Sequence, residues 1–257
     1  MDTVRQGGLG SYDLAGKVAV VAGGSGAIGA ATARRLAKAG ATVVLGCRKQ
    51  DDRVDEIVSG LPGYGHWAVP LPVDDTEAVN HAASLVGQRH GAVHVLVNAA
   101  GTTRQIDHND LDALDDDLFD EIFRVNVRGV YSTIRAFRRW LVSGGDSIVV
   151  NVSSLSSETG KGSSIAYCAS KAALDTMGKS LARVLAPEVR VIGVSPAAVD
   201  TGFVPGRSRE AVLAQANRSP LRTVVAADDV AVSIVGAITQ LRLTTGTVVL
   251  VDGGWHL

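Results

Sequence analysis

Two side chains suited to acid–base chemistry lie in the segment Tyr167-Cys-Ala-Ser-Lys171. The apolar pattern over 165–186 predicts a helix, and residues four apart lie on one helical face. A tyrosine phenol titrates near pH ~10, and a cation a few ångströms away lowers that pKa by favouring the phenolate. Such a tyrosine can exchange a proton with a carbonyl–alcohol pair. The alternative is an exposed helical pair without chemistry.

Three glycines, Gly23, Gly26 and Gly29, follow the apolar run 17–22 and open a helical pattern over 27–39. The chain has 29 glycines in 257 residues, which exceeds the usual share of about 7 %. At a strand-to-helix turn, glycines let the backbone turn tightly and approach a pyrophosphate, which the helix N-terminus attracts. The spacing predicts a dinucleotide-binding turn, and the alternative is a turn that is merely rich in glycine.

The end of the second predicted strand, Leu45-Gly46-Cys47-Arg48, bears on the choice of cofactor. An acidic residue there would bind the ribose 2′-hydroxyl of NAD, and none is present. Arg48 can instead pair with the 2′-phosphate of NADP through charge-assisted hydrogen bonds. The sequence therefore favours NADP(H), with NAD(H) as the alternative cofactor and a solvated surface arginine as the alternative role of Arg48.

The elements that must position these groups alternate along the chain. Short apolar runs predict seven strands, near 17–22, 41–45, 66–72, 92–98, 146–152, 189–195 and 247–251. Helical patterns lie near 27–39, 52–59, 75–89, 117–142, 165–186, 209–216 and 227–240. Parallel neighbours need crossover helices, so the pattern predicts an α/β fold with a doubly wound, mostly parallel sheet. Ligands of such sheets bind beyond the carboxyl ends of the strands.

Composition bounds the class of protein. We expect a flexible arm over 1–14, one domain over 15–257 and a small loop–helix insert at about 201–225. Two cysteines cannot form a disulfide framework, and no apolar run is long enough to span a membrane. The net charge of −1 gives no electrostatic footprint for nucleic acid. Because the first residues do not resemble a signal peptide, a cytoplasmic protein is predicted.

No metal site is expected. Aspartates gather over 107–117, where helix capping explains them better than convergence on an ion. The six histidines are scattered along the chain, so no cluster of metal ligands is indicated.

Together, the motifs resemble those of the short-chain dehydrogenase/reductase (SDR) family, in particular single-domain members such as bacterial 3-oxoacyl-ACP reductases. The resemblance runs from about Leu14 to the C-terminus. Its motifs, in the family's order, are Gly23-x-x-Gly26-x-x-Gly29, Asn98-Ala-Ala-Gly101, Asn126-Val-Arg-Gly129, Ser153-Ser154, Tyr167-x-x-x-Lys171, Ser195-Pro196, Val199-x-Thr201 and Val251-Asp-Gly-Gly254. The resemblance implies a Rossmann fold with helices on both faces of a seven-stranded sheet, in strand order 3-2-1-4-5-6-7.

The resemblance implies a catalytic set of four residues. Tyr167 would be the general acid and base, and Lys171 would lower its pKa and bind the nicotinamide ribose. Ser154, thirteen residues before Tyr167, would hold the substrate oxygen. Asn126 would hold a water that links Lys171 to bulk solvent.

The resemblance also assigns residues to the cofactor and to the substrate. The implied cofactor-binding residues are Gly23, Ser25, Gly26, Ala27, Ile28, Gly29, Arg48, Val73, Asn98, Ala99, Ala100, Gly101, Tyr167, Lys171, Pro196, Ala197, Val199 and Thr201. The implied substrate pocket includes Ser154, Leu155, Ser156, Ala197 and Phe203.

Three positions depart from the family pattern. The glycine spacing over 22–29 differs, so the backbone path of the turn can differ locally. Pro72 stands where the family has an adenine-contacting aspartate, which leaves only a backbone contact from Val73. Ala197 replaces a glycine and adds a methyl group to the pocket wall. None of these changes removes a catalytic group.

These features predict an NADP(H)-dependent oxidoreductase, working as a reductase, that interconverts a ketone and a secondary alcohol on a small molecule or a carrier-linked acyl chain. Arg207, Arg209 and Arg218 would suit an acyl carrier, although a solvated loop explains them equally well. The alternatives are an NAD-dependent alcohol or sugar dehydrogenase and a non-catalytic NADP(H)-binding sensor or scaffold. The resemblance further implies a homotetramer or homodimer, paired through 117–142 and 165–186.

Overall fold

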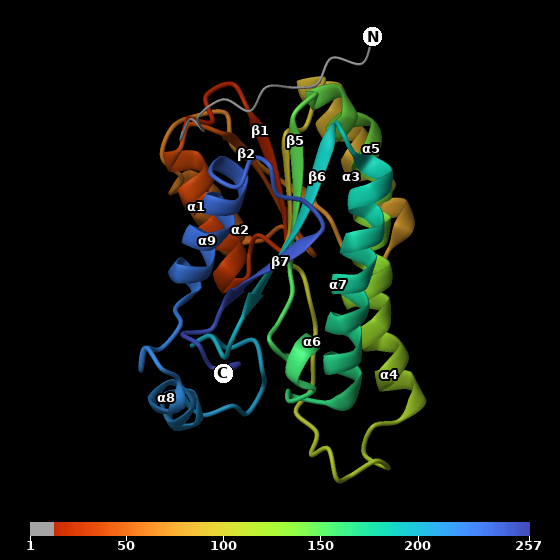
Figure 1. The fold of residues 1–257 in the computed structure, drawn as a ribbon. Coiled ribbons are helices and arrows are strands. Elements are labelled where there is room, and N and C mark those ends of the chain that lie inside the picture. The colour runs from red at the N-terminus through yellow and green to blue at the C-terminus, as the bar shows by residue number, and fades with distance from the viewer. Residues whose placement is uncertain (1–12) are drawn as a thin grey trace.

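The computed structural model describes residues 13–257 and shows a twisted sheet between two layers of helices (Figure 1). The sheet order is β3-β2-β1-β4-β5-β6-β7, and every neighbouring pair is parallel, which confirms the predicted doubly wound fold. The strands are β1 (Val18–Ala22), β2 (Thr42–Cys47), β3 (Trp67–Pro70), β4 (Val95–Asn98), β5 (Ser147–Val152), β6 (Val189–Pro196) and β7 (Thr247–Val251).

Helices cover both faces of the sheet. Helices α1, α2 and α9 lie on one face, and α3, α5 and α7 lie on the other (Figure 1). The helices are α1 (Ala27–Lys38), α2 (Asp52–Ser59), α3 (Thr76–His90), α4 (Asp116–Phe123), α5 (Val130–Gly144), α6 (Ser156–Thr159), α7 (Ile165–Leu185), α8 (Arg209–Arg218) and α9 (Ala227–Thr239), with a π-helical segment η1 (Arg124–Gly129) between α4 and α5.

The central strands are buried along their whole length, which explains why their sequences are continuous apolar runs rather than alternating patterns. Every residue of β1, β4 and β5 is buried. Successive residues of β1 point to opposite faces. Ala19 and Val21 pack with α1 and α9, whereas Val18 and Val20 pack with α3 and α5. This packing fixes β1 rigidly beneath the glycine turn that follows it.

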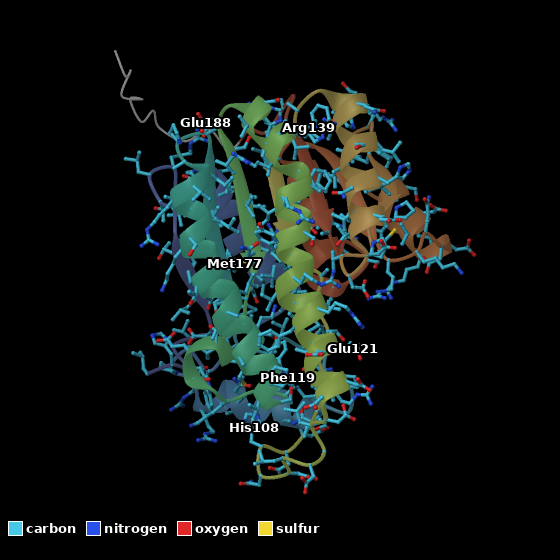
Figure 2. The ribbon with its side chains drawn as sticks, turned by 90° about the vertical axis from the view of Figure 1, so that its right-hand side faces the viewer. His108, Phe119, Glu121, Arg139, Met177 and Glu188 are labelled. Carbon is cyan, nitrogen blue, oxygen red and sulfur yellow. The ribbon has the colours of Figure 1, made fainter. Side chains whose placement is uncertain are left out.

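The predicted helix over 117–142 is three segments rather than one. Helix α4 ends at Phe123, the π-helical segment η1 spans Arg124–Gly129, and α5 begins at Val130. Figure 2 shows α4, with Phe119 and Glu121, beside α7, and both α4 and η1 pack against α7. The π-helical turn contains Asn126, and such turns occur frequently at functional sites.

The remaining differences lie at the ends of elements and in loops. Helix α6 was not expected, because four residues are too few to show an apolar period. The insert near 201–225 contains α8, and an isolated parallel bridge between Val199 and Val225 joins its end to the segment after β6. Residues 1–12 of the expected arm lie outside the described residues. At its end Leu14 is buried, and its N–H donates to Ala39 O at 2.7 Å, so Leu14 belongs to the domain.

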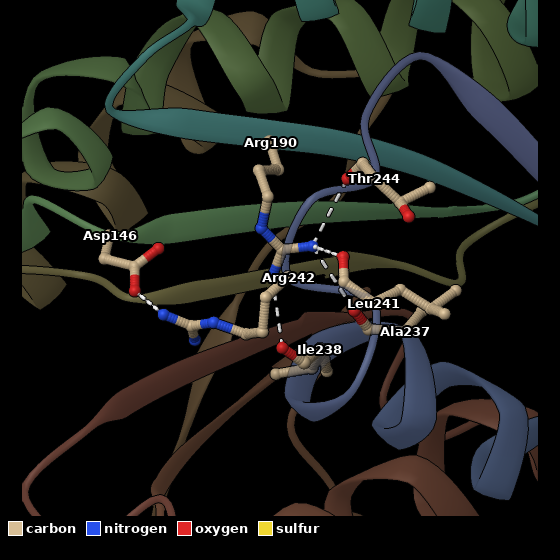
Figure 3. A network of polar contacts seen from close by, with 7 residues as sticks. All are labelled: Asp146, Arg190, Ala237, Ile238, Leu241, Arg242 and Thr244. Carbon is tan, nitrogen blue, oxygen red and sulfur yellow. Dashed lines mark hydrogen bonds and ion pairs between the residues drawn. The ribbon is translucent and has the colours of Figure 1, made fainter. Parts of the chain in front are cut away.

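The amino end of the sheet is fastened by Arg190 on β6 (Figure 3). Its guanidinium donates to the carbonyl oxygens of Leu241 at 2.9 Å and Ile238 at 3.1 Å, and more weakly to those of Ala237 and Thr244 at 3.4 Å. The last carbonyls of a helix lack partners within the helix, so Arg190 caps α9. The contacts of Arg190 are therefore structural, and they lie at the end of the sheet opposite the carboxyl ends of the strands.

Candidate active site

A cleft of about 1120 Å³ lies beyond the carboxyl ends of the strands, between the turn after β1 and the segments around α6, α7 and α8. This is where a doubly wound sheet places its ligands. Eighteen of the residues expected to touch cofactor or substrate line it: Ser25, Gly26, Ala27, Ile28, Gly29, Ala99, Ala100, Gly101, Ser154, Leu155, Ser156, Tyr167, Lys171, Pro196, Ala197, Val199, Thr201 and Phe203.

The turn from β1 to α1 fits a dinucleotide phosphate. Gly23 has φ +76°, and a Cβ there would lie 2.5 Å from Ala100 N. A Cβ at Gly29 would lie 2.2 Å from Gly23 O. No side chain caps the N-terminus of α1, and its first turn holds no acidic residue. Its free N–H groups therefore face the cleft as an anion-binding end, so the turn suits the pyrophosphate of a nicotinamide cofactor.

The phenol and the ammonium expected to act together are both buried in the wall of this cleft. Ser164 caps α7 by accepting from Tyr167 N at 3.2 Å, which starts the helix just before the tyrosine. The Lys171 Nζ lies 5.7 Å from the centre of the Tyr167 ring and donates to Val152 O at 2.8 Å. Lys171 is thereby held between the tyrosine and the end of β5.

Ser154 lies in the turn that follows β5, two residues beyond the strand's end. Its Oγ accepts from Ser156 N at 3.2 Å and donates to Ser156 Oγ at 3.1 Å, so the turn fixes the side chain. A hydrogen bond with Ser154 also acts on the Tyr167 phenol and favours its ionised form. Ser154 and Tyr167 can therefore hold one oxygen between them.

Burial determines how these groups titrate. It raises the pKa of Tyr167 to about 12, although Ser154 and the Arg207 charge act in the opposite direction. This is opposite to the lowered pKa that we predicted, because desolvation of the phenolate outweighs the nearby cations. Burial likewise lowers the pKa of Lys171 to about 8, which Asp175 partly offsets. At neutral pH these pKa values leave Tyr167 protonated and Lys171 charged.

Asn126 ties three segments together. Its Oδ1 accepts from Thr102 N at 2.8 Å, and its Nδ2 donates to Thr102 O at 3.0 Å and to Ser170 Oγ at 3.1 Å. Both donors of the amide are therefore used in joining η1 to the loop after β4 and to α7. A water at Asn126 would have to donate to Oδ1 or bind the backbone.

Four further expected cofactor residues do not line the cleft. Gly23 shapes the turn from below, and Asn98 Nδ2 donates to Asn151 Oδ1 at 2.9 Å across β4 and β5. Val73 is buried, and a Cβ at Gly129 would lie 2.9 Å from its carbonyl oxygen. The Arg48 side chain is 69 % exposed and pairs with Asp74 at 3.2 Å. These residues support the site from behind or lie at its edge.

Among the residues that line the cleft, Arg53 and Trp255 are large side chains to which the sequence analysis assigned no role. Arg53 lies in the first turn of α2, and Trp255 lies beyond β7 with Arg218 5.1 Å above its ring. No sequence pattern predicts that either residue lines the cleft, because only the fold brings α2 and the C-terminal segment together there.

Within residues 13–257, no three or more metal-binding side chains converge on a common point. Among the aspartates over 107–117, Asp115 caps α4 by accepting from Leu118 N at 2.8 Å, and Asp107 and Asp110 accept from backbone N–H groups in the preceding turns. In the same range, no helix has the length and apolarity needed to cross a bilayer.

Comparison with known proteins supports an oxidoreductase. The family model described as enoyl-(acyl carrier protein) reductase matches residues 22–256. A Streptomyces violaceoruber protein, assigned to the granaticin polyketide synthase as a ketoacyl reductase, is 35 % identical over 93 % of this chain and 96 % of its own. The 3-oxoacyl-(acyl-carrier-protein) reductase of Thermotoga maritima is 32 % identical over 94 % and 98 %.

A solved structure agrees in fold. The short-chain dehydrogenase of Burkholderia cenocepacia J2315, in complex with NADP, is 33 % identical. It superposes with a TM-score of 0.84, covering 95 % of this chain and 99 % of that one. With the glycine turn, the Ser154–Tyr167–Lys171 wall and matches over almost the whole chain, this protein belongs to the short-chain dehydrogenase/reductase family and is an oxidoreductase of that family.

Proposed function

We propose that the protein is an NADP(H)-dependent reductase that interconverts a ketone and a secondary alcohol. The observation that carries this proposal is the convergence of Ser154, Tyr167 and Lys171 on one wall of the cleft whose other end is the glycine turn. A sensor or scaffold that only binds a dinucleotide needs the turn but not a buried proton donor beside it. The three side chains together therefore favour turnover.

In this proposal Tyr167 donates its proton to the carbonyl oxygen, and Ser154 holds that oxygen in place. A bound nicotinamide supplies the hydride to the carbonyl carbon in reduction, or takes it back in oxidation. One hydride and one proton convert the ketone into the secondary alcohol. Lys171, charged at neutral pH, steadies the negative charge that develops on the phenol as its proton leaves.

The preference for NADP(H) over NAD(H) rests on two arginines. Arg53 lines the cleft, and Arg48 directly follows the carboxyl end of β2, at the edge of the sheet where the cleft lies. The ion pair of Arg48 with Asp74 is solvent-exposed, and such pairs contribute only about 0–1 kcal/mol, so a 2′-phosphate can compete for Arg48. Cys47 at the end of β2 offers no carboxylate for a 2′-hydroxyl; its thiol points to Val69 O at 3.6 Å.

The decisive experiment compares Tyr167→Phe with Tyr64→Phe. Tyr64 is 93 % exposed and lies outside the cleft, so its variant is a matched control. We expect Tyr167→Phe to lower kcat for ketone reduction by roughly 10²–10⁴-fold while NADPH binding persists. Wild-type turnover in Tyr167→Phe would overturn the mechanism. NADPH binding with no oxidation across a broad panel of ketones would favour the sensor instead.

The physiological substrate is a small carbonyl compound or a carrier-linked acyl chain, the substrate type named for the Thermotoga relative. Its pocket comprises Leu155, Ser156, Ala197 and Phe203 near Tyr167. Phe203 stacks obliquely on Tyr167 with ring centres 6.1 Å apart, so an apolar part of the substrate would lie against it.

We further propose a homodimer or homotetramer in the cytoplasm. Helices α4, α5 and α7 form the layer that faces the viewer in Figure 2. Phe119 on α4, Tyr131 on α5 and Val184 on α7 are large apolar side chains left exposed. Self-association would cover them. Both cysteines are free thiols, as a reducing compartment favours. Light scattering on the eluted protein tests the assembly, and a monomer at micromolar concentration would contradict it.

A further inference from the structure

The charges that line the cleft are all of one sign. Of its described lining residues, none is an aspartate or glutamate, and five carry positive charge: Arg53, Lys161, Lys171, Arg207 and Arg218. A cleft of one sign with low-dielectric walls concentrates ligands of the opposite sign. A nicotinamide dinucleotide accounts for part of this charge, at the glycine turn and Arg53. The cations at the substrate end remain to be explained.

Three of the four remaining cations already have a partner or a solvated position. Lys171 is bound to Val152 O. Arg218 lies over the Trp255 ring, and Lys161 is exposed at the rim. Arg207 differs from these because it is half-buried, and its guanidinium has no hydrogen bond or ion pair with any described residue.

Arg207 lies on the segment between Phe203 and the start of α8, directly before the N-cap residue Ser208. The backbone N–H of Arg207 donates to Val204 O at 3.2 Å, which fixes the turn that directs the residue toward the cleft. Arg207 and Tyr167 line the same cleft, and the ring of Phe203, four residues before Arg207, has its centre 6.1 Å from that of Tyr167. The charge of Arg207 favours the ionised form of Tyr167. Burial lowers the pKa of Arg207, which shows that its charge is partly desolvated.

We propose that Arg207 binds an anionic group of the substrate, a carboxylate carried close to the carbonyl that is reduced. A partly desolvated guanidinium without a partner is costly, and a planar carboxylate would satisfy two of its donors at once. This inference rests on the proposed ketone reductase function and narrows its substrate to oxo acids. The uncharged surface of Phe203 and Leu155 would accept the carbon skeleton.

The same chemistry could come from the phosphate of a carrier's phosphopantetheine arm. That phosphate lies at the far end of a long chain from the acyl carbonyl, whereas Arg207 lines the cleft on the same segment as Phe203, whose ring lies against Tyr167. The proximity therefore favours a carboxylate on the reacting molecule. Two thioesters of 3-oxobutyrate separate the sources, because the phosphopantetheine thioester carries the phosphate and the N-acetylcysteamine thioester does not.

The test measures kcat/KM at saturating NADPH for 4-oxocyclohexanecarboxylate and for its methyl ester, which differ mainly in charge. For the wild type we expect the acid to exceed the ester by about tenfold or more, the effect of one charge-assisted hydrogen bond. Arg207→Gln should abolish this ratio with little change for the ester, and Arg207→Lys should restore part of it. The matched control is Arg209→Gln, because Arg209 is 75 % exposed, pairs with Asp200 and does not line the cleft.

Each outcome has a distinct meaning. The assignment of Arg207 is overturned if the wild type reduces the ester as well as the acid, or if the acid-to-ester ratio is unchanged in Arg207→Gln. Either result leaves the reductase function intact. A loss in Arg207→Gln confined to the phosphopantetheine thioester overturns the carboxylate in favour of a carrier. A rise in KM for NADPH alone would place Arg207 on the cofactor and also overturn it. Failure of the wild type on every ketone, with NADPH still bound, would instead refute the proposed function.

Discussion

Burial disfavours the charged form of both Tyr167 and Lys171, so it raises the pKa of the tyrosine and lowers the pKa of the lysine. It keeps the tyrosine protonated up to a pKa of about 12 and lets the lysine lose its charge near pH 8. The pair is therefore arranged for proton donation below pH ~8, which is the direction needed to reduce a carbonyl. A phenol with a pKa of about 12 stays protonated at neutral pH, so in the proposed mechanism Lys171 sets the pH dependence of the reaction.

The first prediction concerns this pH dependence. We expect kcat/KM for ketone reduction to fall as pH rises through about 8, because Lys171 then loses its charge. The Lys171→Met variant should have a lower kcat/KM at neutral pH, and its kcat/KM should not fall further as pH rises through about 8. A fall near pH 8 that persists in Lys171→Met would show that another group titrates.

The same shift has a thermodynamic readout that needs no substrate. The folded-state pKa of Lys171 lies below its ordinary value of 10.5, so burying the charge costs stability below pH ~8. This cost is relieved as pH rises from about 8 toward 10.5. Lys171→Met should therefore gain stability relative to the wild type at pH 7 and lose that advantage at pH 10, as thermal unfolding at both values would measure.

Cofactor selection is the second prediction at this scale. Arg53 lines the cleft and Arg48 is exposed just beyond β2, and in the proposed function both contact the 2′-phosphate of NADPH. We expect Arg48→Gln and Arg53→Gln each to raise KM for NADPH by about tenfold, with little change for NADH, because only the 2′-phosphate contact is lost. The ratio of kcat/KM for the two cofactors is the measurement. A wild type that prefers NADH would contradict the role of both arginines.

Sequence spacing found Tyr167, Lys171 and the glycine turn because each lies within one element or at one junction. It missed Arg53 and Trp255, and it left the role of Arg207 open. Contacts between such residues depend on how α2, α8 and the segment after β7 meet over the sheet. It also predicted the wrong direction for the pKa shift of Tyr167, because the spacing showed the nearby lysine but not how deeply the phenol is buried.

Among the elements, strands were predicted better than helices. Burial on both faces gives a strand a continuous apolar run that is visible in the sequence, and all seven runs are strands. The π-helical segment η1 leaves no such mark, since its apolar residues keep a helical period. What accompanies it is a set of contacts from Asn126 to Thr102 and Ser170, which lie far away in the sequence.

Asn126→Ala tests this role of η1. Removing the amide leaves the backbone N–H and C=O of Thr102 without their partner, at about 1–3 kcal/mol for each buried group. We expect a lower melting temperature and a lower kcat, because helix α7 and the loop that follows β4 both lose their hydrogen bonds to η1. Ser143→Ala, which removes an exposed hydroxyl bonded to Arg139 O, is the control and should change neither. A change in kcat without a change in stability would instead favour a direct catalytic role.

Arg190 offers an element-scale prediction at the opposite end of the sheet. Arg190→Met removes the donors that satisfy the last carbonyls of α9 (Figure 3) and should destabilise the protein by about 2–3 kcal/mol. Because the cleft lies at the other edge, kcat and KM should remain unchanged under conditions where the variant is folded. Urea unfolding gives the stability, and an altered KM for NADPH would show that the two ends of the sheet are coupled.

The cleft is built by the whole molecule rather than by one segment. Its walls come from residues as far apart in the chain as Ser25 and Trp255, and β7 completes the edge that carries the C-terminal segment. A dinucleotide that extends from the glycine turn to Lys171 and Thr201 would bridge the two halves of the sheet. Ligand binding should therefore stabilise the fold as a unit.

At a concentration of about 100 times its Kd, NADPH should stabilise the protein by roughly 2.7 kcal/mol. For a chain of this size that corresponds to a rise of roughly 5–10 °C in melting temperature. Adenosine 2′,5′-bisphosphate carries the phosphates but no nicotinamide, so at the same concentration it should give a smaller rise, because it leaves Lys171 and Thr201 without a ligand. Thermal unfolding with each ligand makes the comparison. An equal rise would mean that the half of the cleft beside Tyr167 contributes nothing to cofactor affinity, and that binding does not connect the two halves of the sheet.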